Sequence, residues 1–135
     1  MRRVKFRFYS DLTKKMYQLT MMGLHYEYDE DPAVFVGDYV PDELLGGTRV
    51  QRYSDGHVMQ YTGLKDKNGR EIYEGDILGT FGDRLIGKVI FDEDIAAFVF
   101  ETDTFKDWLP NYLGGAGSEI IGNIYENCEL VEGDA

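Results

Sequence analysis

Short stretches of alternating apolar and polar residues recur along this chain, and turn-forming residues separate them. Residues 3–9 alternate strictly, with an apolar face and a basic face. The apolar face consists of Val4, Phe6 and Phe8, and the basic face of Arg3, Lys5 and Arg7. This period of two predicts a half-buried strand. Residues 14–22 continue as a second strand after a turn at 10–13, so these stretches together predict an N-terminal β-hairpin.

The clearest pattern lies in residues 57–77. Apolar and aromatic positions lead into the polar run 65–70, which contains the pair Asn68-Gly69. Both residues of this pair tolerate a positive φ, and such turns match the twist of paired strands. The apolar pattern then resumes, breaks at Gly75 and starts again. We therefore predict a strand, a tight turn, a short strand, a sharp corner at Gly75 and a further strand.

The rest of the C-terminal half also has the pattern of strands joined by short turns. We predict strands at 76–81, 84–92, 95–101 and 118–125. Residues 102–113 are expected to form a short helical turn or loop packed on the core. This spacing of strands from Val58 onward is typical of small barrels.

The segment 29–55 follows no such pattern. Pro41 is followed by acidic residues, which is the composition of a helix start, and Gly46-Gly47 would end such a helix. We predict a helical turn at this point and leave the rest of the segment unassigned.

Three segments of the chain, in this order, resemble the YopX family, which consists of small proteins mostly encoded by bacteriophages and prophages. They are the opening RRVKFRF at 2–8, the run MQYTGLKDKNGREIYEGDIL at 59–78 and the closing EIIGNIYEN at 119–127. Cys128 stands where the family usually has proline, and the segment 29–55 matches no family pattern. The resemblance implies a mainly β domain with an SH3-like barrel. It implies no assigned activity and supplies no catalytic residues.

The expected fold class is therefore mainly β, a small SH3-like barrel or roll with an N-terminal β-hairpin. We expect one YopX-like domain over residues 1–135. It would comprise the hairpin over about 1–28, a variable segment over about 29–55 and the barrel core over about 56–130.

Charge is unevenly distributed along the chain. The whole chain carries 14 Lys and Arg against 25 Asp and Glu, whereas residues 71–135 carry 3 against 15. This excess of acid does not suit a simple phosphate-binding face. The chain begins with charged residues and has no apolar run long enough to span a bilayer, so we expect no membrane association and a cytoplasmic location in a bacterial host.

Candidate chemical motifs are incomplete. Residues 82–89 nearly spell a P-loop, but Val89 replaces the hydroxyl residue that would hold magnesium, and a β-rich stretch follows in place of a helix. His25, His57 and Cys128 are isolated in sequence and lack the paired spacing of metal ligands. We therefore expect no catalytic, cofactor-binding or metal-binding residues, no cofactor and no enzymatic activity.

Two sets of residues are candidates for contact with a partner. The basic residues of the N-terminal hairpin could contact nucleic acid or the acidic half of a neighbouring subunit; alternatively, they keep an exposed sheet face soluble or guard an edge strand. They are Arg3, Lys5, Arg7, Lys14 and Lys15. Tyr61 and Tyr73 could flank a groove, as aromatic residues do in peptide-binding and single-strand-binding barrels. The alternative is that both tyrosines are core or interface residues.

The function that we expect from these observations is that of a non-enzymatic phage or prophage accessory protein. It would self-associate into a homo-oligomer and bind a host or phage protein. Two alternatives remain open. One is nucleic-acid contact through the basic hairpin, and the other is an acidic decoy that mimics DNA and occupies a host protein.

Overall fold

The computed structural model divides the chain into two compact units. Residues Lys5–Met59 form the N-terminal unit, and Gln60–Ala135 together with Met1–Val4 form the C-terminal unit. The chain passes from one unit to the other within strand β6 (Gly56–Lys65). The structure describes residues 4–18, 22–25, 33–42, 47–52, 56–82, 84–113 and 117–131, and for those between 22 and 52 it describes the backbone alone.

The N-terminal unit contains the expected hairpin. Strand β1 (Phe6–Ser10) pairs antiparallel with β2 (Met16–Gln18). The strand differs from the expected half-buried one at its end, because Phe8, Tyr9 and Ser10 are all buried. Alternation along the sequence therefore predicts the strand correctly but not its burial, since packing on both faces is a tertiary effect.

A second antiparallel sheet in this unit has the order β3-β4-β5. Its strands are β3 (Met22–His25), β4 (Ala33–Asp42) and β5 (Gly47–Arg52). The prediction of a helical turn at Pro41 is wrong, because Pro41 lies in β4 opposite Thr48. Cross-strand pairing here outweighs the local helix-start signal, and the proline is tolerated because β3 pairs only with the beginning of β4. The remainder of that predicted turn, residues 43–46, lies outside the described residues.

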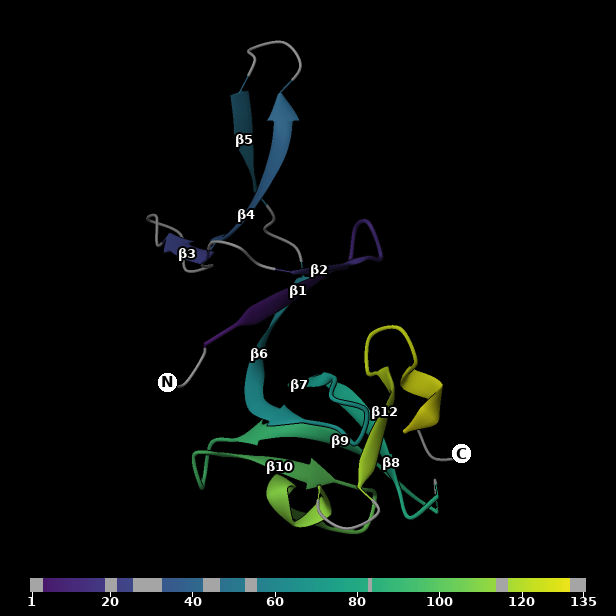
Figure 1. Ribbon diagram of the computed structural model, residues 1–135. Coiled ribbons are helices and arrows are strands. Elements are labelled where there is room, and N and C mark those ends of the chain that lie inside the picture. The colour runs from purple at the N-terminus through teal and green to yellow at the C-terminus, as the bar shows by residue number, and fades with distance from the viewer. Residues whose placement is uncertain are drawn as a thin grey trace. The chain divides into compact units, whose positions relative to one another are not determined.

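The C-terminal unit is built on an antiparallel sheet of five strands in the order β11-β10-β9-β8-β12. The strands are β8 (Asp76–Thr80), β9 (Leu85–Asp92), β10 (Ala97–Glu101), β11 (Lys106–Trp108) and β12 (Ser118–Asn123). In the same unit β6 pairs with β7 (Glu71–Tyr73). Figure 1 shows how these strands curl, so that the antiparallel sheets form a half-barrel. The mainly β fold class is thus confirmed.

One hydrophobic core fills this half-barrel. Its buried members come from strands across the unit and from the short 3-10 helix η1 (Leu109–Tyr112). They are Ile72, Leu78, Val89, Phe100, Leu109 and Ile120. Each such side chain contributes on the order of 1.5–3 kcal/mol when it leaves water. Because Leu109 is fully buried, the expected helical turn packed on the core is confirmed.

Two further observations concern helices. A second 3-10 helix, η2 (Cys128–Leu130), follows the last strand. In the part of the chain that the structure describes, no helix has the length and apolar character required to cross a membrane.

Candidate functional site

The turn after β6 is organised by the carboxylate of Asp66. Its Oδ1 accepts the backbone N–H groups of Asn68 and Arg70, each at 2.9 Å, and its Oδ2 accepts that of Ile120 at 3.1 Å. Burial by itself raises the pKa of the carboxyl, but these three hydrogen bonds outweigh it and hold the pKa below its ordinary value. Since Ile120 lies in β12, this carboxylate ties a local turn to a distant strand.

The corner predicted at Gly75 is present, and it joins three parts of the half-barrel. Gly75 has a φ of +88°, a conformation that glycine adopts without a steric penalty. Its N–H donates to the carbonyl of Val89 at 2.7 Å, and its carbonyl accepts the N–H of Ile124 at 2.9 Å. Beside it, Oδ2 of Asp76 accepts the N–H of Tyr73 at 2.8 Å. The corner therefore holds β7, β9 and the end of β12 together.

The closing segment of the chain is held in the same way. Oδ1 of Asn123 accepts the N–H groups of Tyr125 and Glu126, and Oδ1 of Asn127 accepts the N–H of Asn123 at 3.2 Å. A Cβ at Gly122 would lie 2.6 Å from that Asn127 oxygen, so only glycine fits there without displacing it. The conspicuous sequence motifs of this chain thus build its scaffold.

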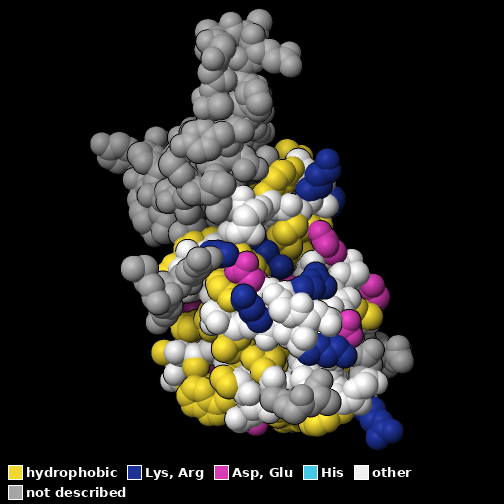
Figure 2. Space-filling model, viewed as in Figure 1, with side chains coloured by type: hydrophobic (Ala, Val, Ile, Leu, Met, Phe, Trp, Pro, Cys, Tyr) yellow, Lys and Arg dark blue, Asp and Glu magenta, His cyan; other side chains and the backbone are white. Residues whose placement is uncertain are grey.

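A groove of about 590 Å³ lies on the C-terminal unit, and we call it the aromatic groove. Three segments line it: residues 60–64 of β6, Phe91 with residues 96–98 of the β9–β10 hairpin, and Trp108 with Pro110. Figure 2 shows hydrophobic side chains gathered at the lower left of the view, where Figure 1 places this hairpin. A volume of this size lies within the range of sites that bind ligands.

Two aromatic side chains of the groove are unusually exposed. Phe91 is 41% exposed and Trp108 is 52% exposed. Phe91 packs edge to face on Phe98, with ring centroids 5.3 Å apart, so its position is fixed although one side faces solvent. Ile95, in the turn of the same hairpin, is also exposed. Apolar surface of this kind marks interaction sites in proteins that are otherwise well packed.

Asp107 holds the backbone that carries Trp108. Its carboxylate accepts the N–H of Trp108 at 2.8 Å, the amide of Asn111 at 3.4 Å and the hydroxyl of Tyr112 at 3.1 Å. The hydrogen bond from the N–H of Trp108 lowers the pKa of Asp107 most, and the three interactions together hold this pKa below its ordinary value. The indole of Trp108 is therefore attached to an ordered turn.

Acidic residues border the groove. Glu93 and Asp94 lie exposed in the hairpin turn, between Phe91 and Ala96, which both line the groove. We call this pair the acidic rim. The neighbouring Asp92 differs from them because it is buried and forms an ion pair with Lys106 at 2.8 Å. The rim thus places two exposed carboxylates in the turn that joins Phe91 to Ala96, although neither of them lines the groove itself.

The structure separates the residues that the sequence proposed as partner contacts. Tyr61 and Tyr73 are buried neighbours with ring centroids 5.6 Å apart; Tyr61 lines the aromatic groove, and Tyr73 is not among its lining residues. Lys5 and Arg7 are partly buried residues of the N-terminal unit. Arg3 lies outside the described residues.

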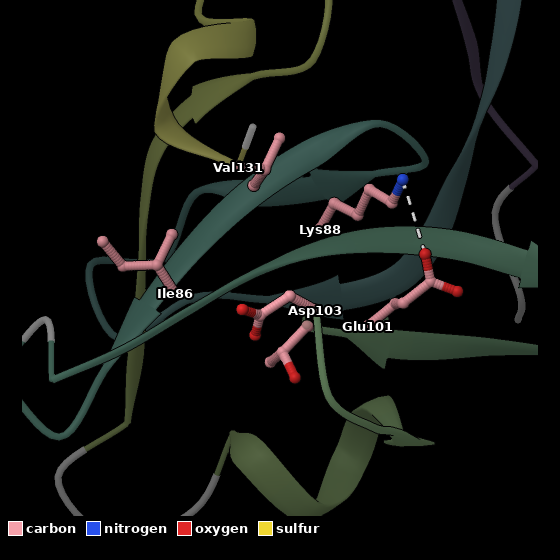
Figure 3. Close-up of a pocket in the computed structure, with 6 residues that line it drawn as sticks. Ile86, Lys88, Glu101, Asp103 and Val131 are labelled. Atoms are coloured by element: carbon pink, nitrogen blue, oxygen red, sulfur yellow. Dashed lines mark ion pairs between the residues drawn. The ribbon is translucent and has the colours of Figure 1, made fainter. Parts of the chain in front are cut away.

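A smaller pocket of about 250 Å³ lies elsewhere on the same unit. Figure 3 shows Lys88 and Glu101, which face each other across β9 and β10 and form an ion pair at 3.4 Å. Lys88 is the lysine of the incomplete P-loop, and it lies within a strand. Because its charge is balanced by Glu101, we assign no ligand to this pocket.

The residues weighed as metal ligands are dispersed. Nε2 of His57 lies 3.2 Å from a carboxylate oxygen of Asp11, and Cys128 is a free, exposed thiol. The side chain of His25 lies outside the described residues. Among residues that the structure describes, no three His, Cys, Asp or Glu side chains form a group that could hold a metal ion.

The scaffold of turns agrees with the sequence resemblance. The family profile described as "YopX protein" matches residues 5–132 of the chain. The chain belongs to the YopX family. Two of the motifs that carry this membership, at 59–78 and 119–127, hold strands of the half-barrel together, and residues 60–64 of the first of them also line the aromatic groove.

Two crystal structures of other proteins are similar to the structure of this chain. Protein EF1440 from Enterococcus faecalis is 28% identical with a TM-score of 0.66, and the alignment covers 98% of this chain and 100% of that one. Protein yopX from Bacillus subtilis is 14% identical with a TM-score of 0.55 over the same shares, which shows likeness of fold alone. No curated protein sequence matches the chain.

Most of the aromatic groove of this YopX-family protein was missed by sequence reasoning. Of its aromatic residues only Tyr61 was proposed, whereas Phe91 and Trp108 were taken for parts of a strand and a packed turn. Their periodicity is that of core residues, and nothing local shows that the fold leaves them exposed. The one usable signal is that an acidic turn, 92–94, follows Phe91 directly.

Proposed function

We propose that this YopX-family protein is a non-enzymatic binding module that holds an apolar segment of a partner protein, flanked by Lys or Arg, in its aromatic groove. The observation that carries the proposal is the pair Phe91 and Trp108, both about half exposed in a groove on an acidic unit. Aromatic side chains of this kind supply most of the binding energy at protein interfaces.

Charge favours basic flanks on the partner. The acidic rim lies beside the groove, and residues 71–135 carry 15 acidic residues against 3 basic ones. Opposite charge on the partner accelerates encounter, and like charge is rejected. An apolar anchor would fill the groove, while basic flanks would lie against the rim.

The biological setting that we propose rests on the family resemblance. We place the protein in the cytoplasm of a bacterial host, as a phage or prophage accessory protein whose partner is a host protein, a phage protein or a further copy of itself. Nucleic-acid contact has less support: of the residues proposed for it, Lys5 and Arg7 are partly buried, and only Lys14 and Lys15 are exposed among those that the structure describes. The acidic-decoy hypothesis explains the charge but not the exposed aromatic side chains.

The single tryptophan of the chain is Trp108, so intrinsic fluorescence reports directly on the groove. Titration with a synthetic peptide that has a leucine-rich centre and lysine flanks is expected to shift the emission of Trp108 to the blue, because docking removes water from the indole. The same peptide with glutamate flanks is expected to bind at least about 10-fold more weakly. Equal binding of the two peptides would contradict the role of the rim, and no binding of either would refute the proposed function.

Truncation of the groove gives a second test. Phe91→Ala is expected to raise the Kd for the lysine-flanked peptide by about 30-fold, since an interface hot spot is worth about 2 kcal/mol. Phe81→Ala is the matched control, because Phe81 is also an exposed aromatic residue of this unit but does not line the groove. Calorimetric titration measures both. A similar loss in the two variants would show that binding does not depend on the groove.

A further inference from the structure

The turn between β1 and β2 presents an apolar knob. Leu12 is 79% exposed, more than any other large hydrophobic side chain that the structure describes. The turn that carries it is closed by hydrogen bonds from the Lys14 N–H to the Ser10 carbonyl at 2.9 Å and from the Ser10 N–H to the Lys15 carbonyl at 3.1 Å. Ser10 Oγ also accepts the N–H of Thr13 at 3.1 Å. Leu12 is thus held in solvent by an ordered turn.

Two lysines follow this knob in the chain, and an aspartate that contacts a histidine precedes it. Lys14 and Lys15 follow Leu12 and are both exposed. Asp11, which precedes it, lies with a carboxylate oxygen 3.2 Å from Nε2 of His57. The knob therefore consists of one apolar side chain with two cations beside it, which is the chemistry that the aromatic groove and its acidic rim are proposed to bind.

We propose that the occupant of the aromatic groove is the β1–β2 turn of a second copy of this chain, with Leu12 against Phe91 and Trp108 and with Lys14 and Lys15 near the acidic rim. This inference rests on the proposed function, because it names the partner of the same groove. Both surfaces are ordered before they meet, so little conformational entropy is lost on binding. The two surfaces differ, which makes the contact heterologous: each copy offers a knob to one neighbour and a groove to another.

A heterologous contact can be tested by complementation. Leu12→Glu removes the knob and keeps the groove, and Trp108→Ala removes the groove aromatic and keeps the knob. We expect wild-type protein to assemble between 1 and 100 μM, on the order of ordinary interface affinities, and each variant alone to assemble at least about 30-fold more weakly in sedimentation velocity. An equimolar mixture of the two variants is expected to form one-to-one dimers that do not grow.

The mixture also has a built-in reporter. Its only tryptophan is Trp108 of the Leu12→Glu copy, whose groove is intact, so its emission is expected to shift to the blue when the Trp108→Ala copy is added. The double variant Leu12→Glu/Trp108→Ala is the control partner and is expected to cause no shift. Phe91→Ala, which retains the fluorophore, provides a second groove variant in case Trp108→Ala does not fold.

The outcomes separate this inference from the proposed function. A wild-type chain that stays monomeric at 100 μM, or one whose assembly is unchanged by Leu12→Glu, overturns the inference, on the order-of-magnitude scale of weak interfaces. If the lysine-flanked peptide still binds the groove in that case, the proposed function stands with another partner. If the peptide also fails to bind, both proposals fail.

Discussion

Replacement of Asp66 by alanine is expected to lower the free energy of unfolding by about 3 kcal/mol. The substitution removes the acceptor of three backbone N–H groups. The amides of Asn68 and Arg70 can turn to water, because both residues are exposed, but that of Ile120 is left buried without its acceptor. Urea denaturation followed by the fluorescence of Trp108, which lies in the same unit, measures the effect.

The same carboxylate makes stability depend on pH. Because its pKa in the folded protein is lowered, Asp66 stabilises the fold fully above its ordinary value of 3.8, and this contribution is lost as the pH falls through and below that value. The stability difference between wild type and Asp66→Asn is therefore expected to shrink in acid.

The control for Asp66→Ala is Asp103→Ala, which removes an exposed carboxylate of the same unit. A change of less than about 0.5 kcal/mol for Asp66→Ala would show that the turn does not need its carboxylate.

Gly87→Ala is expected to destabilise the C-terminal unit by about 2 kcal/mol, within the usual range for overpacking. A Cβ at this position of β9 would lie 2.6 Å from Cζ of Phe100 and 2.8 Å from the carbonyl oxygen of Glu101. Phe100 is fully buried, and a backbone oxygen cannot turn aside. The sign of the effect is informative, because alanine in place of a strand glycine with open space is usually stabilising.

Two further variants isolate the steric cause. Gly69→Ala introduces a Cβ with no neighbour within 4 Å but keeps a φ of +80°, so it is expected to cost only about 1 kcal/mol of backbone strain. Phe100→Leu is expected to cost less stability in the Gly87→Ala background than in wild type, because it removes the ring atoms that the added Cβ would meet. Thermal unfolding of wild type, Gly87→Ala, Phe100→Leu and the double variant measures this coupling. Strictly additive effects, or a stabilised Gly87→Ala protein, would contradict the close approach of Phe100.

The binding surface and the family motifs of this protein are largely separate. The hydrogen bonds of Asp66, Gly75 and Asn123 hold strands in place, and the groove draws on Phe91 and Trp108, outside those motifs. Only residues 60–64 belong to both. Substitutions in the motifs are therefore expected to act through stability, and substitutions in the groove through affinity.

The local elements of the C-terminal unit can be predicted from the amino-acid sequence alone. Strands, the turn at Asn68-Gly69 and the corner at Gly75 follow from side-chain period and from the φ that particular residues allow, and both are local properties. The same local rules failed at Pro41, where pairing between β4 and β5 overrides a helix-start signal. Local preference is worth tenths of a kcal/mol per residue and yields to pairing and burial.

The contacts between those elements, in contrast, depend on how the chain folds in three dimensions. The carboxylate of Asp66 reaches an amide 54 residues away, and Tyr61, Phe91 and Trp108 line one groove although they lie far apart in the chain. Likewise, an aromatic residue in a strand has the same sequence pattern whether it lies in the core, as Phe100 does, or is exposed near the end of its strand, as Phe91 is. Periodicity reports which side of a strand a residue occupies, whereas the curl of the sheet decides what covers that side.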